Sequence, residues 1–151
     1  MHKAELLQNL KAQHELLISV SKKIQEKGLE NEIIDKKWVL KDVISHLSLY
    51  EREAVNVLKK KSMEDNPFYT RSDDDRNEEN FTKTHAKSLK EITENANKTF
   101  KELYSETEKL NQPELDSSFL GMKKSVGNFI AGESYAHYPD HIPKLQKRFN
   151  I

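Results

Sequence analysis

Apolar residues recur at helical spacing along four stretches of the chain, and polar segments separate these stretches. In the first stretch, residues 3–27, Gly28 follows the last apolar position and supplies a stop signal. The inward-facing positions of this stretch are Leu6, Leu10, His14, Leu17 and Ile24, with Leu7 and Ile18 widening the stripe. The pattern predicts a first amphipathic helix over residues 3–27.

A second helix is predicted over residues 39–61. Trp38 lies just before it and can pack against its first turn as a hydrophobic staple. Its apolar face consists of Val43, His46, Leu47, Tyr50, Ala54, Val57 and Leu58. The polar segment that follows, residues 62–80, contains Pro67 and has the length of a functional or mobile loop. We therefore expect an extended loop there.

A third helix is predicted to begin near Asp73–Asp75, inside the end of that segment. Ser72 or Asp73 can cap it, and an acidic first turn suits the helix dipole. Its apolar stripe runs through Phe81, His85, Leu89, Ile92, Ala96, Phe100 and Leu103. The segment "LNQPELDSS", residues 110–118, then interrupts the pattern.

A fourth helix is predicted over residues 122–149. One side of it carries Val126, Ile130, Ser134, His137, His141 and Leu145. Gly127 and Gly132 lower its helix propensity, so packing must hold it. Four amphipathic helices predict an all-α protein, a single four-helix-bundle domain spanning residues 1–151. The linkers permit crossovers, so an up-down-down-up order is as consistent with the pattern as simple up-and-down.

Composition narrows the function classes. The 25 basic and 25 acidic residues balance, which argues against nucleic-acid binding by general charge attraction. The absence of cysteine excludes disulfides, thiolate metal ligands and a cysteine nucleophile. No apolar run approaches the roughly 20 residues that span a bilayer, and the polar beginning of the chain lacks a secretory signal. We therefore expect a cytoplasmic protein without a membrane partner.

The segment "ESYAHYPDHIPKL" places His137 and His141 four residues apart. On an ideal helix the two would lie about 40° apart around the axis and about 6 Å apart along it, so both imidazoles could reach one ion. Pro139 stands between them and leaves two alternatives. It distorts a continuous helix, or it starts a new helical turn and places His137 outside the regular helix. We expect distortion rather than an end.

His46 strengthens the hypothesis of a metal site. It lies in the middle of the apolar face of the second helix, so three imidazoles from two helices would form one ligand set. Affinity favours zinc or nickel, and availability would allow iron or manganese. Because free histidine titrates near pH 6.5, we expect binding to fail below about pH 6. The alternative is a buried hydrogen-bonding histidine beside a histidine-rich helix end.

Other polar residues on these faces have two interpretations each. His14 and His85 could line a pocket or supply a general base, although half-exposed positions at the ends of the bundle are favoured. Glu53 could orient the His46 ring, but a surface charge explains it better. The phenols that could line a pocket, or simply pack in the core or at its rim, are Tyr50, Tyr135 and Tyr138.

Three segments together resemble a known superfamily. "KKWVLKDVISHLSLYERE" resembles the Trp-x-x-Lys-Asp-x-x-x-His-Leu signature of DinB/YfiT-like four-helix bundles. "SDDDRNEENFTKTHAKSLKEI" is similar to the beginning of their third helix, and "GESYAHYPDHIPKL" to their final His-x-x-x-His helix. The ClbS/DfsB group looks closest. Val39 departs from the Ser or Thr that often follows the tryptophan, which predicts a weaker helix cap.

The resemblance implies a DinB-like bundle with His46, His137 and His141 as a divalent-metal triad, and a homodimer, as in several members. Relatives include thiol-dependent S-transferases, a thiol-dependent isomerase and, in the ClbS branch, a cyclopropane hydrolase that acts on a genotoxin. The first hypothesis is therefore a metal-dependent hydrolase or thiol S-transferase acting on a small electrophilic molecule in detoxification or stress. The alternatives are a non-catalytic small-molecule-binding bundle without required metal and a structural or dimerisation domain.

Overall fold

The computed structural model describes all 151 residues and is helical throughout, with no strand. The long helices are α1 (Lys3–Glu26), α2 (Leu40–Lys60) and α5 (Leu89–Glu108). The shorter elements are α3 (Pro67–Thr70), α4 (Asp73–Thr84), α6 (Gln112–Asp116), α7 (Val126–Glu133), the 3-10 turn η1 (Tyr138–Asp140) and α8 (Ile142–Phe149). The all-α prediction is confirmed.

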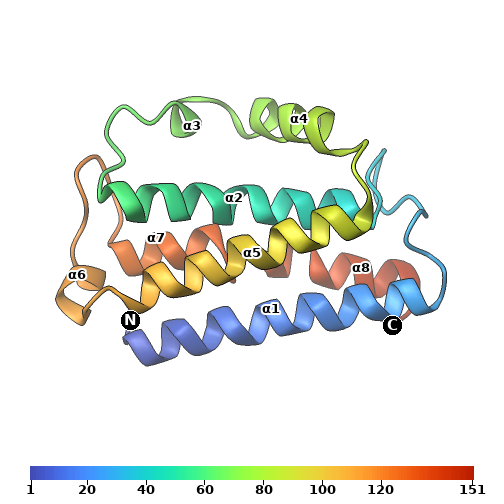
Figure 1. Ribbon diagram of the computed structural model, residues 1–151, viewed down its shortest axis with the longest axis horizontal. Coiled ribbons are helices and arrows are strands. Elements are labelled where there is room, and N and C mark those ends of the chain that lie inside the picture. Colours follow the sequence, from blue (N-terminus) through green and yellow to red (C-terminus); the bar gives the residue numbers. More distant parts are fainter.

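Four long segments lie side by side, namely α1, α2, α5 and the α7–α8 pair (Figure 1). Helix α1 and the α7–α8 pair run in one direction, and α2 and α5 run in the other (Figure 1). The two consecutive helices of like direction, α2 and α5, are joined by a crossover that contains α3 and α4. Helix α4 packs along the outer side of α2, opposite the other long segments (Figure 1).

The first two helices follow their predicted bounds and faces. Gly28 adopts a left-handed conformation with φ +68°, and the Leu29 N–H donates to the Ile24 carbonyl, which ends α1. Ile18 is the exception on the first stripe, because its side chain is 45% exposed. At the start of α2, Val39 has no side-chain acceptor, and its own N–H donates to Asp42 Oδ2 at 2.9 Å. Asp42 therefore supplies part of the missing cap.

The prediction of one third helix was wrong, because the chain breaks between α4 and α5. Ser88 Oγ accepts a hydrogen bond from the Glu91 N–H and caps a new helix there. The two helices lie on different sides of α2, so Phe81 and His85 remain outside the core. The predicted extended loop, residues 62–80, contains α3 and the start of α4, since Asn66 caps α3 at the Phe68 N–H.

The prediction of one fourth helix was also wrong. Helix α7 ends at Glu133, and Ser134 leaves the helical region with φ −131° and ψ −111°. Pro139 lies in the first turn of η1 and Pro143 in the first turn of α8. A first-turn proline loses no helical hydrogen bond, whereas the middle of a continuous helix would lose one at each proline. Pro139 therefore starts a new turn rather than distorting a long helix.

The core consists of two apolar clusters, one toward each end of the molecule. One is built around Leu6, Leu10 and Leu103, and the other around Ile24, Leu40 and Leu145. Along each of the four long segments, a buried polar residue stands between the contributions to the two clusters. These four residues are His14, Glu51, Thr99 and Ser134. The middle of the protein is therefore more polar than either end.

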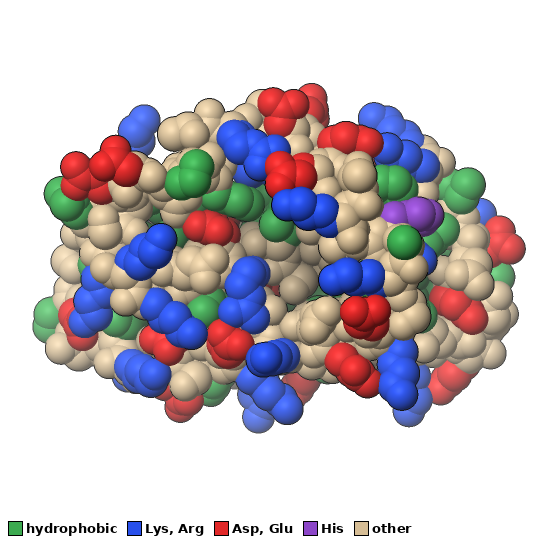
Figure 2. Space-filling view, turned by 45° about the horizontal axis from the view of Figure 1, so that its top comes forward, with side chains coloured by type: hydrophobic (Ala, Val, Ile, Leu, Met, Phe, Trp, Pro, Cys, Tyr) green, Lys and Arg blue, Asp and Glu red, His purple; other side chains and the backbone are tan.

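The surface mixes charges of both signs. Figure 2 shows lysine and arginine side chains interspersed with aspartate and glutamate over the face that it presents. None of the helices has both the length and the apolar character that crossing a bilayer requires.

The loop that precedes α7 packs closely against the chain after α2, and a substitution at Gly121 can test this contact. The Met63 N–H donates to the Leu120 carbonyl, and a Cβ on Gly121 would lie 2.8 Å from the Glu64 nitrogen. Gly121 and Gly28 both have positive φ, but nothing lies within 4 Å of a Cβ on Gly28. We expect Gly28→Ala to lose about 1 kcal/mol of unfolding free energy from conformation alone. Gly121→Ala should lose clearly more in urea denaturation, and equal losses would contradict the contact.

Candidate metal centre

Three histidine rings meet at one point between α2 and the turn that precedes α8. His46 Nε2 lies 3.1 Å from His137 Nε2, and His141 Nε2 lies 3.2 Å from the same atom. The ring centroids form a nearly equilateral triangle, with separations of 4.8, 4.7 and 4.9 Å. The structure thus brings together the three residues that the sequence predicted as ligands.

Packing and backbone bonds hold each ring in place. His46 is buried on α2, with the Trp38 ring centroid 5.0 Å and the Tyr50 ring centroid 5.3 Å from its own. The backbone N–H of His137 donates to the Ser134 carbonyl, and the backbone N–H of His141 donates to the Tyr138 carbonyl. The short turn between His137 and His141 therefore brings their imidazoles together, as a continuous helix was expected to do. His137 lies outside regular helix and still meets His141.

Burial keeps the three imidazoles neutral. It lowers the pKa of His46 to about 3, and the neighbouring His137 and His141 act in the same direction. Burial also lowers the pKa of His141 to about 4 and lowers the pKa of His137. Neutral imidazole is the form that binds a metal ion. The expected loss of metal below about pH 6 rested on ordinary histidine pKa values, so proton competition should begin at lower pH.

The donor set fits a divalent transition metal. Two nitrogens bound tetrahedrally at zinc would lie roughly 3.3 Å apart, because the bonds are about 2.0–2.1 Å long. The ligand atoms of the cluster all lie within 4.8 Å of one another, so His46 and His141 need only a small approach. Three imidazole nitrogens suit zinc, nickel, copper or iron better than magnesium or calcium, which prefer oxygen.

One ring nitrogen of the cluster lacks the usual support. With Nε2 as the ligand atom, the His46 Nδ1 carries the proton, and it is buried without a well-formed hydrogen bond, although the Asn77 side chain lies near the ring. Metal-ligating histidines usually donate this proton to a carboxylate or carbonyl. The ring orientation of His46 therefore depends on packing against Trp38 and Tyr50.

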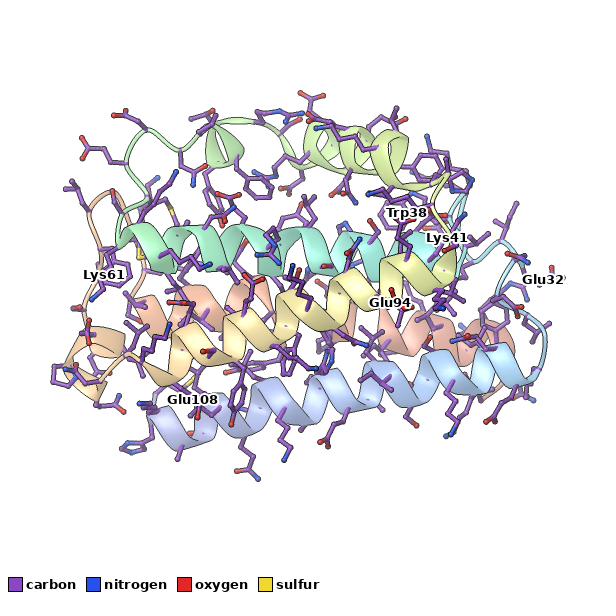
Figure 3. The ribbon with its side chains drawn as sticks, in the orientation of Figure 1. Glu32, Trp38, Lys41, Lys61, Glu94 and Glu108 are labelled. Atoms are coloured by element: carbon purple, nitrogen blue, oxygen red, sulfur yellow. The ribbon has the colours of Figure 1, made fainter.

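The three histidines face a groove of about 940 Å³. Figure 3 shows Trp38 between α4 and the beginning of α2, where it forms one wall of this groove. The charged residues of the groove carry both signs and come from three regions of the chain: Asp35, Lys36 and Lys37, then Asp73, Asp74, Asp75 and Glu78, then Lys144. A small polar molecule could therefore reach the histidines.

The other residues singled out from the sequence lie elsewhere or act differently. His14 is buried in the core with its ring stacked on Phe100 at 3.8 Å, away from the triad. His85 Nδ1 is 2.9 Å from Asp42 Oδ1. Glu53 accepts from Asn66 Nδ2 at 2.8 Å and supports the loop before α3, with no hydrogen bond to His46.

The three candidate phenols lie in three different surroundings. Tyr50 lines the groove, with its hydroxyl donating to Asn77 Oδ1 at 3.1 Å. Tyr138 turns away from the histidines and donates to the buried carboxylate of Glu51. The Tyr135 hydroxyl contacts the Met1 sulfur near the surface.

Sequence reasoning did not identify the roles of three polar residues that the structure makes important. Glu51 follows Leu47 by four residues and precedes Ala54 by three, so its helical position already indicated burial. Asp42 stands three residues after the N-cap, the position that completes a capping box. Asn77 had no signal, because its role depends on where α4 packs.

The lowered histidine pKa values predict acid sensitivity of the metal-free protein. In the unfolded chain His46 titrates near 6.5, but in the folded protein its pKa is about 3, so the unfolded state takes up a proton first. Above pH 6.5 His46 contributes no pH dependence, and below it the penalty grows as pH falls. From pH 7 to pH 5 this difference costs the fold about 2 kcal/mol.

Urea denaturation of the metal-free protein at both pH values, compared with His46→Gln, measures this difference. The wild type should lose about 2 kcal/mol more than the variant between pH 7 and pH 5. Glu51 acts in the opposite direction in both proteins, because its raised pKa of about 7 adds stability as pH falls. The comparison cancels that contribution. Equal losses in the two proteins would show that His46 is not buried as a neutral ring.

Comparison with known proteins found no family model, no curated protein and no solved structure that matches the chain. The site is therefore described by its own geometry: three neutral imidazoles that could hold a metal ion in a groove of mixed charge.

Proposed function

We propose that this protein is a DinB-like four-helix bundle that holds one divalent metal ion and acts on a small electrophilic molecule as a hydrolase or thiol S-transferase. The convergence of the neutral His46, His137 and His141 at a solvent-accessible groove carries the proposal. Two separate parts of the chain supply these rings, and the groove has room for both a metal and a substrate.

The arrangement of helices supports the bundle. The first and last long segments run in one direction and the middle two in the other, with α3 and α4 in the crossover (Figure 1). The signature residues also have physical roles in this chain. Trp38 packs beside His46, and Asp42 caps α2 at the Val39 N–H. The resemblance to DinB/YfiT-like bundles thus includes residues that support the site, Trp38 and Asp42.

The groove suits a small substrate together with a charged partner. A metal ion bound to the triad would polarise an electrophile and lower the pKa of a water or thiol in contact with it. Trp38 and Tyr50 offer aromatic walls for the electrophile. Lysines and aspartates along the rim, among them Lys144 and Asp73, suit a thiol that carries both an ammonium and a carboxylate.

A second candidate function rests on the same distances. Nitrogen separations of 3.1 and 3.2 Å are also hydrogen-bond distances, so the three neutral rings could share protons without a metal. The protein would then be a non-catalytic bundle that binds a small molecule in the groove. Metal content distinguishes the two functions.

Metal content is the first test. Protein purified without a histidine tag and dialysed against zinc or nickel should retain one ion per chain by elemental analysis. His46→Ala should lose most of it, because the two remaining imidazoles bind less tightly than three. His14→Ala is the matched control, since His14 is also a buried histidine but lies outside the triad. Equal metal in wild type and His46→Ala would contradict the site.

Trp38 offers an independent readout, because it is the one tryptophan of the chain and lies 5.0 Å from the His46 ring. Cobalt(II) should quench its fluorescence with an end point of one equivalent in the wild type and in His14→Ala. Quenching in His46→Ala should require a large excess.

Activity is the second test. The zinc-loaded protein should accelerate conjugation of cysteine or glutathione with chlorodinitrobenzene, or hydrolysis of a strained or activated electrophile without thiol. His46→Ala should reduce the rate to the background level, because the metal supplies the activation. His2→Ala, at the exposed start of the chain, should keep the wild-type rate. Full metal loading without acceleration across a broad panel of electrophiles and thiols would favour the binding function.

A further inference from the structure

A second cavity lies on a different side of α2 from the metal groove. It has a volume of about 130 Å³ and is enclosed by α1, α2 and α5, with Tyr138 of η1 at its wall. Leu17, Ile44 and Leu47 give it an apolar lining. Exposed residues of α1 line its outer end, namely Ile18, Lys22 and Gln25, so the cavity can be reached from solvent.

A buried carboxylate without a full set of partners lies in this cavity. Glu51 is 3% exposed, and its Oε1 accepts a hydrogen bond from the Tyr138 hydroxyl. Its Oε2 accepts no hydrogen bond from the protein. Burial raises the pKa of Glu51 to about 7, against the opposing effect of the Tyr138 hydrogen bond. A buried acid of this kind is costly unless something satisfies it.

Two further polar atoms of the lining lack partners. The Thr93 Oγ1 is buried without a hydrogen bond, and the His14 Nδ1 is buried without a well-formed one, although the Asn97 side chain lies near the His14 ring. They come from α1 and α5, the two helices that face Glu51 across the cavity. Buried polar atoms are nearly always paired, so three incomplete groups around one space indicate that a ligand completes them.

The charges in the cavity select the ligand. Glu51 repels anions, and the only cationic side chain of the lining, Lys22, is exposed at the outer end. An ammonium group offers three donors, whereas the unpaired Glu51 oxygen and the Thr93 hydroxyl can accept. The apolar lining suits a short hydrocarbon tail. A cavity of about 150 Å³ holds benzene in another protein, so about five or six non-hydrogen atoms fit here.

We propose that this cavity is a binding site for a small primary amine, bound as its ammonium ion against Glu51 with its alkyl tail among Leu17, Ile44 and Leu47. The cavity is a separate space from the metal groove, because no residue lines both. Tyr138 connects the two sites, since it lies between His137 and His141 in the chain and its hydroxyl is on Glu51.

The binding should depend on pH through Glu51. The titratable or charged groups that face it are His14 and Lys22 from α1 and Tyr138 from η1, whereas α5 contributes the non-titrating Thr93 and Asn97. Burial lowers the pKa of His14 to about 4, so His14 stays neutral between pH 6 and pH 8. An alkylammonium ion stays charged over the same range. Ionisation of Glu51 therefore strengthens binding as pH rises.

The test titrates butylammonium chloride into metal-free protein at constant ionic strength and follows the amide NMR shifts of Thr93 and Ala96. We expect saturable shifts at pH 8 and about tenfold weaker binding at pH 6, because Glu51 is then mostly protonated. Butanol, which has the same size without charge, should not weaken from pH 8 to pH 6. Metal-free protein keeps the amine from binding a metal and separates this result from that of the metal centre.

Two variants complete the experiment. Glu51→Gln keeps the shape and the Tyr138 hydrogen bond, and should weaken butylammonium binding at least tenfold while retaining butanol. Ala96→Leu fills the cavity without a change of charge and should abolish binding of both butylammonium and butanol. This variant tests the location of the site even if Glu51→Gln does not fold. Absence of saturable shifts with butylammonium at pH 8, equal affinity in Glu51→Gln, or unchanged binding in Ala96→Leu would each overturn the proposal.

Discussion

The enclosure of α2 is the constraint on which the rest of the structure depends. Thirteen of its 21 residues are buried, among them the polar residues Asp42, His46 and Glu51. One side of α2 meets the core segments, and the other is covered by α4 (Figure 1). A helix covered in this way has to satisfy polar groups on several faces. The end of α4 meets Asp42 through His85, and the segment before α8 meets His46 through His137 and Glu51 through Tyr138.

The buried polar residues divide the interior into regions with different chemistry. Apolar clusters at the two ends provide the burial that stabilises the fold. Between them, the carboxylate of Glu51 and the neutral ring of His14 are held in a medium that opposes charge. The same opposition keeps His46, His137 and His141 unprotonated. One physical effect, desolvation, thus keeps neutral three imidazoles that could hold a metal ion, and gives Glu51 a pKa near neutral pH.

The sequence predicted the positions of α1 and α2 and most of their buried faces, because helical periodicity depends only on local spacing. It also singled out the three histidines, but the continuous helix expected to carry His137 and His141 was wrong. The breaks were missed for a different reason. Ser88 with Glu91 carries a capping signature that the continuous apolar stripe concealed, and the interruption at Ser134 has no signature of its own. The Glu51–Tyr138 contact joins residues 87 positions apart, so only the folded chain could reveal it. Likewise, the orientation of α4 decides which residues of the polar segment reach the groove.

The break between α7 and α8 has a consequence for how such a site can change over evolutionary time. In a continuous helix, each inserted or deleted residue rotates everything beyond it by about 100°, so one such change would carry a downstream ligand to the opposite side. Residues 134–141 form a non-repeating connection instead. Its length and conformation can vary while α7 and α8 keep their register against the core. The spacing of His137 and His141 can therefore change through this connection without a shift in the packing of α7 or α8 against the core.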